Sequence, residues 1–257
     1  MSLEQTAPPS RASIRFDAVD ALRGLAMVWM TLFHFGFDLN HFGYWQQDFY
    51  RDPFWLWQRT LIVSLFLFCA GMGQAIALKQ GQRWPRFWRR WVQVFSCALL
   101  VTLGSWLMYR QSFIYFGVLH GIAVMLIVAR LTAHWGGWLW LLGAAAIAVK
   151  FIAAQALDSA AFSQYADIFN APGLNWLGLI TRKPITEDYV PLLPWLGVMW
   201  WGVATGSWLL NRNASCLSWR LPVPLKPLAT LGRWSLSYYM LHQPVMIGAL
   251  MAAGWLL

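Results

Sequence analysis

Long apolar runs separated by short polar stretches dominate the pattern of this chain. A helix that crosses a lipid bilayer needs about 20 mostly apolar residues. Seven runs are long enough, and they lie at residues 20–38, 60–78, 90–109, 113–131, 137–156, 190–210 and 229–256. The pattern therefore predicts an all-α, polytopic membrane helix bundle with about seven transmembrane helices.

The last run differs from the others because it is longer and contains Pro244 and several glycines. A proline inside a helix removes a backbone hydrogen bond and often causes a kink. We expect this helix to be kinked or split, which leaves the side of the C-terminus open. No internal repeat is visible, so we expect one transmembrane domain at residues 17–257 after a polar tail at residues 1–16. The first apolar run is long enough to be an uncleaved span.

Basic residues in the connections indicate the orientation. Residues 79–90 contain five basic side chains and no acid: Lys79, Arg83, Arg86, Arg89 and Arg90. Such loops stay in the cytoplasm. Alternation then puts the N-terminal tail and residues 211–228 in the cytoplasm, and residues 39–58 and 157–189 outside. We expect a multi-pass protein of the inner (plasma) membrane.

The composition supports this interpretation of the apolar runs. The chain is 59% hydrophobic and only 11% charged, with 19 tryptophans among 257 residues. Tryptophan is enriched at membrane–water interfaces, and a soluble domain is about a quarter charged. The net charge of +9 is explained by cytoplasmic loops, so we expect a lipid bilayer and no nucleic acid as a partner. The three cysteines lack metal-ligand spacing, and we expect no metal site.

Ionisable residues interrupt the first apolar run and its end. They are Asp20, Arg23, His34, Asp38 and His41. Such groups are costly in lipid, and they usually face a cavity or a partner and mark function. Arg23 and His34 are eleven residues apart, so a helix places them on one stripe, roughly 16 Å apart along its axis. Asp20 and Asp38 extend this line by one turn at either end.

Two interpretations of this polar line stay open. In the chemical one, His34 transfers protons with Asp38 as its orienting carboxylate, and Arg23 binds an anion such as a phosphate. In the structural one, Asp20 and Arg23 form an interfacial ion pair, and His34 and Asp38 only join helices. His120, in the fourth run, is either a site residue or a buried hydrogen-bonded histidine. Tyr238 and His242 can share a face of the last run, where joining helices is the favoured role.

Segments of four predicted spans resemble a known family of membrane enzymes. DALRGLAMVWMTLFH contains an Arg, ten residues and a His, which resembles the first-helix signature of the acyltransferase 3 family. HFGFDLNHFG, SLFLFCAGMG and FGVLHGIAVM resemble the bacterial branch related to heparan-α-glucosaminide N-acetyltransferase, and LGRWSLSYYMLHQPV resembles the closing helix of this superfamily. These segments lie in the first, second, fourth and last predicted spans, so the resemblance extends over most of the predicted membrane domain.

The resemblance implies a membrane acyltransferase that moves an acyl group, typically from acetyl-CoA, to an amine or hydroxyl of a glycan or other small acceptor. It implies a catalytic role for His34, with His41 as the alternative because the lysosomal relatives carry their reactive histidine after the first helix. The same resemblance favours a role in the site for His120. Arg23 with its neighbour Asp20, Arg233 and the basic 79–90 connection become candidates for binding CoA.

Two other classes of function compete with the enzyme. In a transporter or permease the same polar line conducts a substrate or protons, but transporters often carry paired repeats with broken helices, and none is evident here. A structural membrane subunit would leave the five ionisable groups unexplained. The sequence leaves the acceptor, the acyl chain and a homo-oligomer open.

Overall fold

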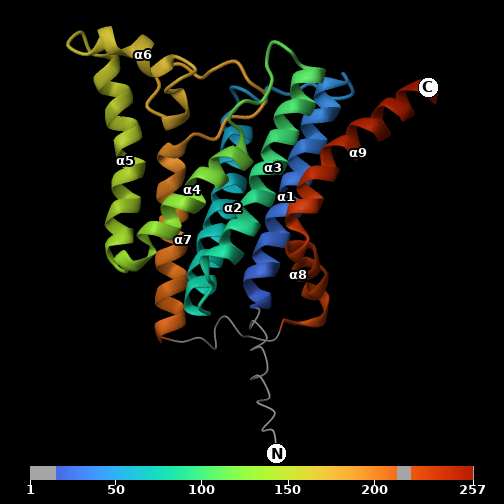
Figure 1. The fold of residues 1–257 in the computed structure, drawn as a ribbon. Coiled ribbons are helices and arrows are strands. Elements are labelled where there is room, and N and C mark those ends of the chain that lie inside the picture. Colours follow the sequence, from blue (N-terminus) through green and yellow to red (C-terminus); the bar gives the residue numbers. More distant parts are fainter. Residues whose placement is uncertain (1–15, 213–220, 257) are drawn as a thin grey trace, which may run out of the picture.

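The described residues form a bundle of helices (Figure 1), in a computed structural model that describes residues 16–212 and 221–256. The helices are α1 (Asp17–His41), α2 (Pro53–Lys79), α3 (Trp84–Met108), α4 (Val118–Thr132), α5 (Trp138–Asp158), α6 (Ala166–Asn170), α7 (Leu192–Arg212), α8 (Lys226–Arg233) and α9 (Ser235–Leu256). Short 3₁₀ helices occupy Ala133–Trp135, Ser163–Tyr165, Asn175–Leu177 and Val223–Leu225. No β-strand occurs in the described ranges, so the all-α prediction is confirmed.

Four helices are long and apolar enough to cross a membrane. Within the described part of the chain they are α2, α3, α4 with the 3₁₀ turn that follows it (Val118–Trp135), and α5. The other predicted runs form α1, α7 and the pair α8–α9. Polar side chains lower the mean hydropathy of α1, and α8 has only 8 residues. A polytopic helix bundle is therefore confirmed, whereas the count of seven spans stays a prediction.

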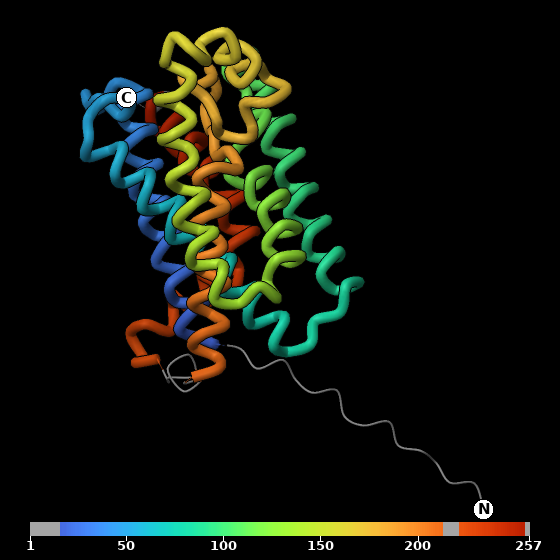
Figure 2. Tube along the Cα trace, turned by 90° about the vertical axis from the view of Figure 1, so that its left-hand side faces the viewer, coloured from blue at the N-terminus to red at the C-terminus, as the bar shows by residue number. Residues whose placement is uncertain are grey.

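The bundle has two chemically different ends. At one end lie the start of α1, the α2–α3 connection and the end of α7, and at the other lie the connections 42–52, 109–117 and 159–191 (Figure 1). We call these the arginine end and the loop end. Figure 2 shows α5 and α7 side by side between the two ends, with the long connection around α6 above them. Consecutive long helices thus alternate in direction, which the side assigned to each connection requires.

Glycines allow three helix pairs to pack closely. A Cβ atom at Gly24 of α1 would overlap the Leu228 carbonyl of α8, and one at Gly232 of α8 would overlap the Asp20 carbonyl of α1. The same relation joins α2 to α7 through Gly71 and Gly202, and α5 to α7 through Gly143 and Gly197. Small residues let membrane helices approach in this way. As a result α1 is fixed between α2, α8 and α9.

The last predicted run is split, as expected, but the break lies at Trp234 and not at Pro244. Pro244 lies inside α9, whose final part turns away from the bundle in Figure 1. Because proline removes one backbone hydrogen bond, it accounts for this bend without ending the helix. The described end of α9 lies at the loop end. The tail before Phe16 and residues 213–220 of the predicted 211–228 connection, which include Cys216, fall outside the described residues.

Candidate active site

The polar line of α1 is continuous with one on α9. The hydroxyl groups of Thr31 on α1 and Tyr238 on α9 are 2.7 Å apart. One turn further toward the loop end, the rings of His34 and His242 lie 5.3 Å apart between centroids, at an angle of 64°. The next turn brings Asp38 to the side chain of α9 residue Gln243. Residues about 200 positions apart in the sequence thus form one layer between two helices.

Hydrogen bonding in this layer is incomplete. Nε2 of Gln243 donates to Oδ1 of Asp38 at 2.8 Å. Asp38 is only 3% exposed and His242 9%, yet Oδ2 of Asp38, Nε2 of His242 and Oε1 of Gln243 have no hydrogen-bond partner among the described residues. Most buried polar atoms in proteins are hydrogen-bonded, so each exception needs an explanation. Three such unpartnered atoms in one layer indicate side chains arranged to bind a ligand or water.

The predicted pairing of His34 with Asp38 is not formed. Asp38 uses its bonded oxygen for Gln243, and the half-buried His34 ring makes no hydrogen bond to a described residue. Its neighbours are the rings of Phe33 and His242. The four-residue spacing does place His34 and Asp38 on one face of α1. The hydrogen-bond partner of Asp38, however, is Gln243 of α9. The predicted contact between His34 and Asp38 is therefore wrong, whereas their roles in catalysis stay predictions.

His41 lies at the end of α1 and outside this layer. Its side chain is exposed, and its ring contacts Phe42 edge-on. The histidine is within electrostatic range of Asp38, but α1 ends there and presents it toward the loop end. Of the two first-helix histidines that the sequence proposed, only His34 joins the enclosed polar layer.

His120 is placed elsewhere, at the start of α4, with both of its ring nitrogens occupied. The Gly117 backbone N–H donates to Nδ1 at 3.3 Å, and Nε2 lies 3.0 Å from the Thr102 hydroxyl. That hydroxyl donates its hydrogen to the Ile114 carbonyl, so Nε2 carries the hydrogen toward Thr102. The ring is satisfied as a neutral cap of α4, and no contact joins it to His34. This geometry favours the structural interpretation of His120.

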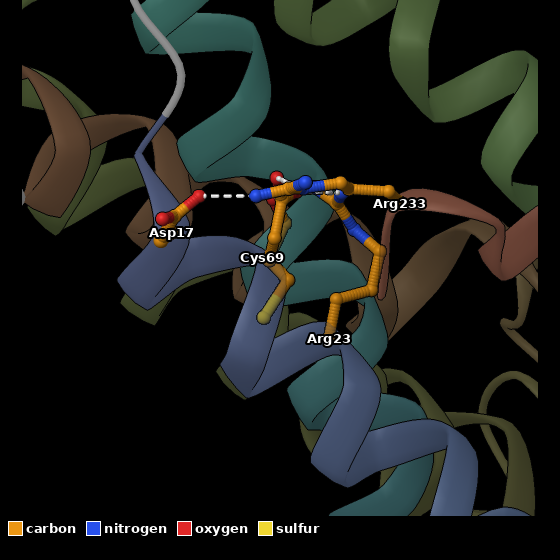
Figure 3. A network of polar contacts seen from close by, with 5 residues as sticks. Asp17, Arg23, Cys69 and Arg233 are labelled. Carbon is orange, nitrogen blue, oxygen red and sulfur yellow. Dashed lines mark hydrogen bonds and ion pairs between the residues drawn. The ribbon is translucent and has the colours of Figure 1, made fainter. Parts of the chain in front are cut away.

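The three residues expected to bind the cofactor meet at the arginine end (Figure 3). Nη1 of Arg23 lies 3.1 Å from Asp20, and Nη2 of Arg233 lies 2.6 Å from Asp17. Nε of Arg233 is 3.7 Å from the other oxygen of Asp20, and Arg23 also donates to the Cys69 carbonyl of α2. Two guanidinium groups thus face two carboxylates. The cluster ties α1 to α2 and α8 and is nearly neutral.

The connection 159–191 is held onto the loop end by its acids. Oδ2 of Asp188 accepts a hydrogen bond from the Val118 backbone N–H at 2.7 Å, at the start of α4. The Ser112 hydroxyl donates to Glu187 at 2.5 Å. Burial raises the pKa of the Asp188 carboxyl, although the bond from Val118 lowers it in part. Glu187 and Asp188 therefore have structural partners that hold this connection against the start of α4.

Sequence reasoning missed Thr31 and Gln243 and interpreted His242 as a residue that joins helices. The signal that existed was the spacing of Tyr238 and His242 on one face.

The two described cysteines, Cys69 and Cys97, are free thiols. The described residues contain no group of three or more His, Cys, Asp or Glu side chains placed to hold a metal ion.

Comparison with known proteins identifies the family of this chain. The profile described as heparan-alpha-glucosaminide N-acetyltransferase, catalytic, matches residues 15–244. That range includes α1, most of the bundle and the part of α9 with Tyr238, His242 and Gln243. Searches of curated proteins and of solved structures gave no significant match. The chain belongs to the family of the heparan-alpha-glucosaminide N-acetyltransferase catalytic domain, an acyltransferase family of membrane proteins, as the resemblance of its segments predicted.

Proposed function

We propose that the protein transfers an acetyl group from acetyl-CoA at the arginine end to an amine or hydroxyl of a glycan-like acceptor at the loop end. Family membership supports acyl transfer as the class of reaction. The observation that carries the proposal is the layer around His34, whose buried polar atoms lack partners among the residues that the structure describes. Acyl transfer needs a buried acceptor of this kind to take the proton of the attacking amine or hydroxyl where water is scarce.

His34 is the residue that we assign to the reacting acyl group. A thioester is already activated, so the acceptor atom needs only to lose a proton as it bonds to the acyl carbon and the carbon–sulfur bond breaks. An imidazole can take that proton as a general base, or it can carry the acyl group on a ring nitrogen before transfer. The absence of a hydrogen bond from His34 to a described residue supports both roles, since either requires a free nitrogen.

The phosphates of CoA need unpaired positive charge. Arg23 and Arg233 face Asp20 and Asp17, so their charges are largely compensated. The arginines of the α2–α3 connection and the start of α3 make no ion pair with a described acid; they are Arg83, Arg86, Arg89 and Arg90. We therefore assign phosphate binding to these arginines, with Arg23, Asp20 and Arg233 shaping the entrance beside them.

The membrane topology follows from the same charges. Basic residues concentrate at the arginine end and acids at the loop end, which agrees with a cytoplasmic arginine end and N-terminus under the positive-inside rule. Acetyl-CoA is a cytoplasmic metabolite, so donor and acceptor would reach the layer between α1 and α9 from opposite sides. The same argument supports a location in the inner (plasma) membrane of the cell.

The decisive experiment measures hydrolysis or exchange of radiolabelled acetyl-CoA by the purified full chain. We expect turnover by the wild type and its loss in His34→Ala, with acetyl-CoA binding and the melting temperature retained. His134→Ala is the matched control, because His134 is exposed in the turn between α4 and α5. Full turnover in His34→Ala would remove this histidine from the reaction.

The same assay separates the enzyme from the transporter. A chain that neither binds nor turns over acetyl-CoA would not be the proposed transferase, and conduction of a substrate along α1 and α9 would become the better explanation. Binding without turnover would instead indicate that an acceptor is required, which addition of amino and hydroxy sugars then tests.

A further inference from the structure

The tautomer of His242 follows from its surroundings. Nδ1 lies 2.7 Å from the backbone carbonyl oxygen of Tyr239. A carbonyl oxygen can only accept, so Nδ1 carries a hydrogen and donates it. In the neutral ring, Nε2 then carries a lone pair and no hydrogen. The carbonyl fixes His242 in the same sense in which a carboxylate orients the histidine of a catalytic triad.

The lone pair on Nε2 is buried and unused. His242 is 9% exposed, and its Nε2 has no hydrogen-bond partner among the described residues. Because Nδ1 points back to the carbonyl of its own helix, Nε2 on the other edge of the ring points away from it. The Tyr238 ring stacks on the His242 ring at 5.9 Å and 9°, and the His34 ring lies on another side at 5.3 Å. The ring is thus held in place with its basic nitrogen free.

The contrast with His120 shows what a purely structural histidine looks like in this bundle. His120 has a donor at one nitrogen and an acceptor at the other, whereas His242 has only one of its two nitrogens bonded. Gln243, the next residue on α9, and its partner Asp38 also carry buried oxygens without a hydrogen-bond partner in the described part of the chain. A residue that merely joined α9 to α1 would bond across the interface, and His242 does not.

We propose that His242, and not His34, is the general base of the reaction centre and that its Nε2 accepts the proton of the acyl acceptor. This inference rests on the proposed function and extends it. As the acceptor oxygen or nitrogen bonds to the acyl carbon, its proton moves to Nε2, and the carbon–sulfur bond breaks with its electron pair on sulfur. The proton then passes from Nε2 to that sulfur, which leaves as the thiol of CoA and returns His242 to its neutral state. His34 contacts the acyl group in this step.

The test uses purified full-length protein and the release of free CoA thiol from acetyl-CoA, with glucosamine as the amine probe and methyl glucoside as the hydroxyl probe. His242→Asn keeps a donor for the Tyr239 carbonyl but removes the base. We expect its kcat to fall about 100-fold or more, with the KM for acetyl-CoA within about twofold of wild type. His134→Asn is the matched control and is expected to keep the wild-type rate.

A second variant separates a chemical role from a structural one. His242→Ala leaves space beside His34, and added imidazole is expected to restore part of its rate, because a free base can then occupy that space. Wild-type rates in His242→Asn would overturn the inference, and so would a loss in both variants that imidazole does not reverse. Wild-type protein that releases no thiol with either probe would instead overturn the proposed function, and this inference with it.

Discussion

A buried carboxylate must be paired or hydrogen-bonded, and Asp38 meets this requirement with a neutral amide. Gln243 donates one hydrogen bond to it at 2.8 Å, and the remaining oxygens of both side chains have no partner within residues 16–212 and 221–256. Leaving one of these groups without the other would strand a buried donor or a buried charge. At the scale of single residues, the pair therefore both fixes α9 against α1 and leaves acceptors free inside the site.

Exchange of the two groups tests this pairing. Gln243→Glu should destabilise the protein, because it places a second carboxylate against Asp38 in a buried position. Asp38→Asn in the same protein should restore stability, since the amide then donates to the new carboxylate. We expect a coupling free energy of about 0.5–3 kcal/mol in a double-mutant cycle of thermal unfolding. Additive effects of the two substitutions would show that the side chains do not interact.

Asp38→Asn alone is informative about catalysis. The asparagine keeps an oxygen for the Gln243 donor, so the fold should be retained, while the negative charge one helical turn from His34 is lost. We expect acyl transfer to be slower than in wild type but faster than in His34→Ala, as measured by turnover of labelled acetyl-CoA. An unchanged rate would show that the charge of Asp38 has no part in the reaction.

At the scale of helices, the site depends on how closely α8 packs on α1. Gly24 and Gly232 leave no room for a Cβ atom between the two helices, and α8 carries Arg233 toward Asp17 and Asp20. The ion pairs of Figure 3 therefore follow from glycine packing as much as from charge. The break at Trp234 then lets α9 start in a new direction and run along the polar side of α1.

Gly24→Ala tests this dependence on packing. The added methyl group meets the backbone of Leu228, which cannot move without shifting α8. We expect a loss of about 1–3 kcal/mol in the free energy of unfolding together with weaker acyl transfer. Gly104→Ala on α3 is the control, because nothing lies within 4 Å of its added Cβ. A substitution there should be neutral or should stabilise the helix by roughly 0.5–1 kcal/mol; equal effects at both sites would contradict the role assigned to the α1–α8 contact.

At the scale of the whole molecule, the sequence predicted what depends on local periodicity. The helical fold, the position of the first helix and the line from Arg23 to His34 follow from the repeat of the helix and the cost of charge in lipid. The residues of α9 that contact α1 could not be predicted in this way, because the pairing of Asp38 with Gln243 depends on contacts between segments about 200 residues apart. Gln243 is a single amide without a periodic pattern, so only the packed structure could reveal its role.

The orientation in the membrane is the property of the whole molecule that the loop charges predict most directly. Arg83 lies exposed at the arginine end, and Ser163 lies exposed in the connection at the loop end. In a variant whose native cysteines are serine, we introduce Arg83→Cys or Ser163→Cys and label intact cells with a membrane-impermeant maleimide. We expect Ser163→Cys to be labelled from outside and Arg83→Cys only after the membrane is opened, because the basic end stays in the cytoplasm. The opposite pattern would place the α2–α3 arginines outside, where acetyl-CoA is not supplied, and would exclude their proposed role as a phosphate site.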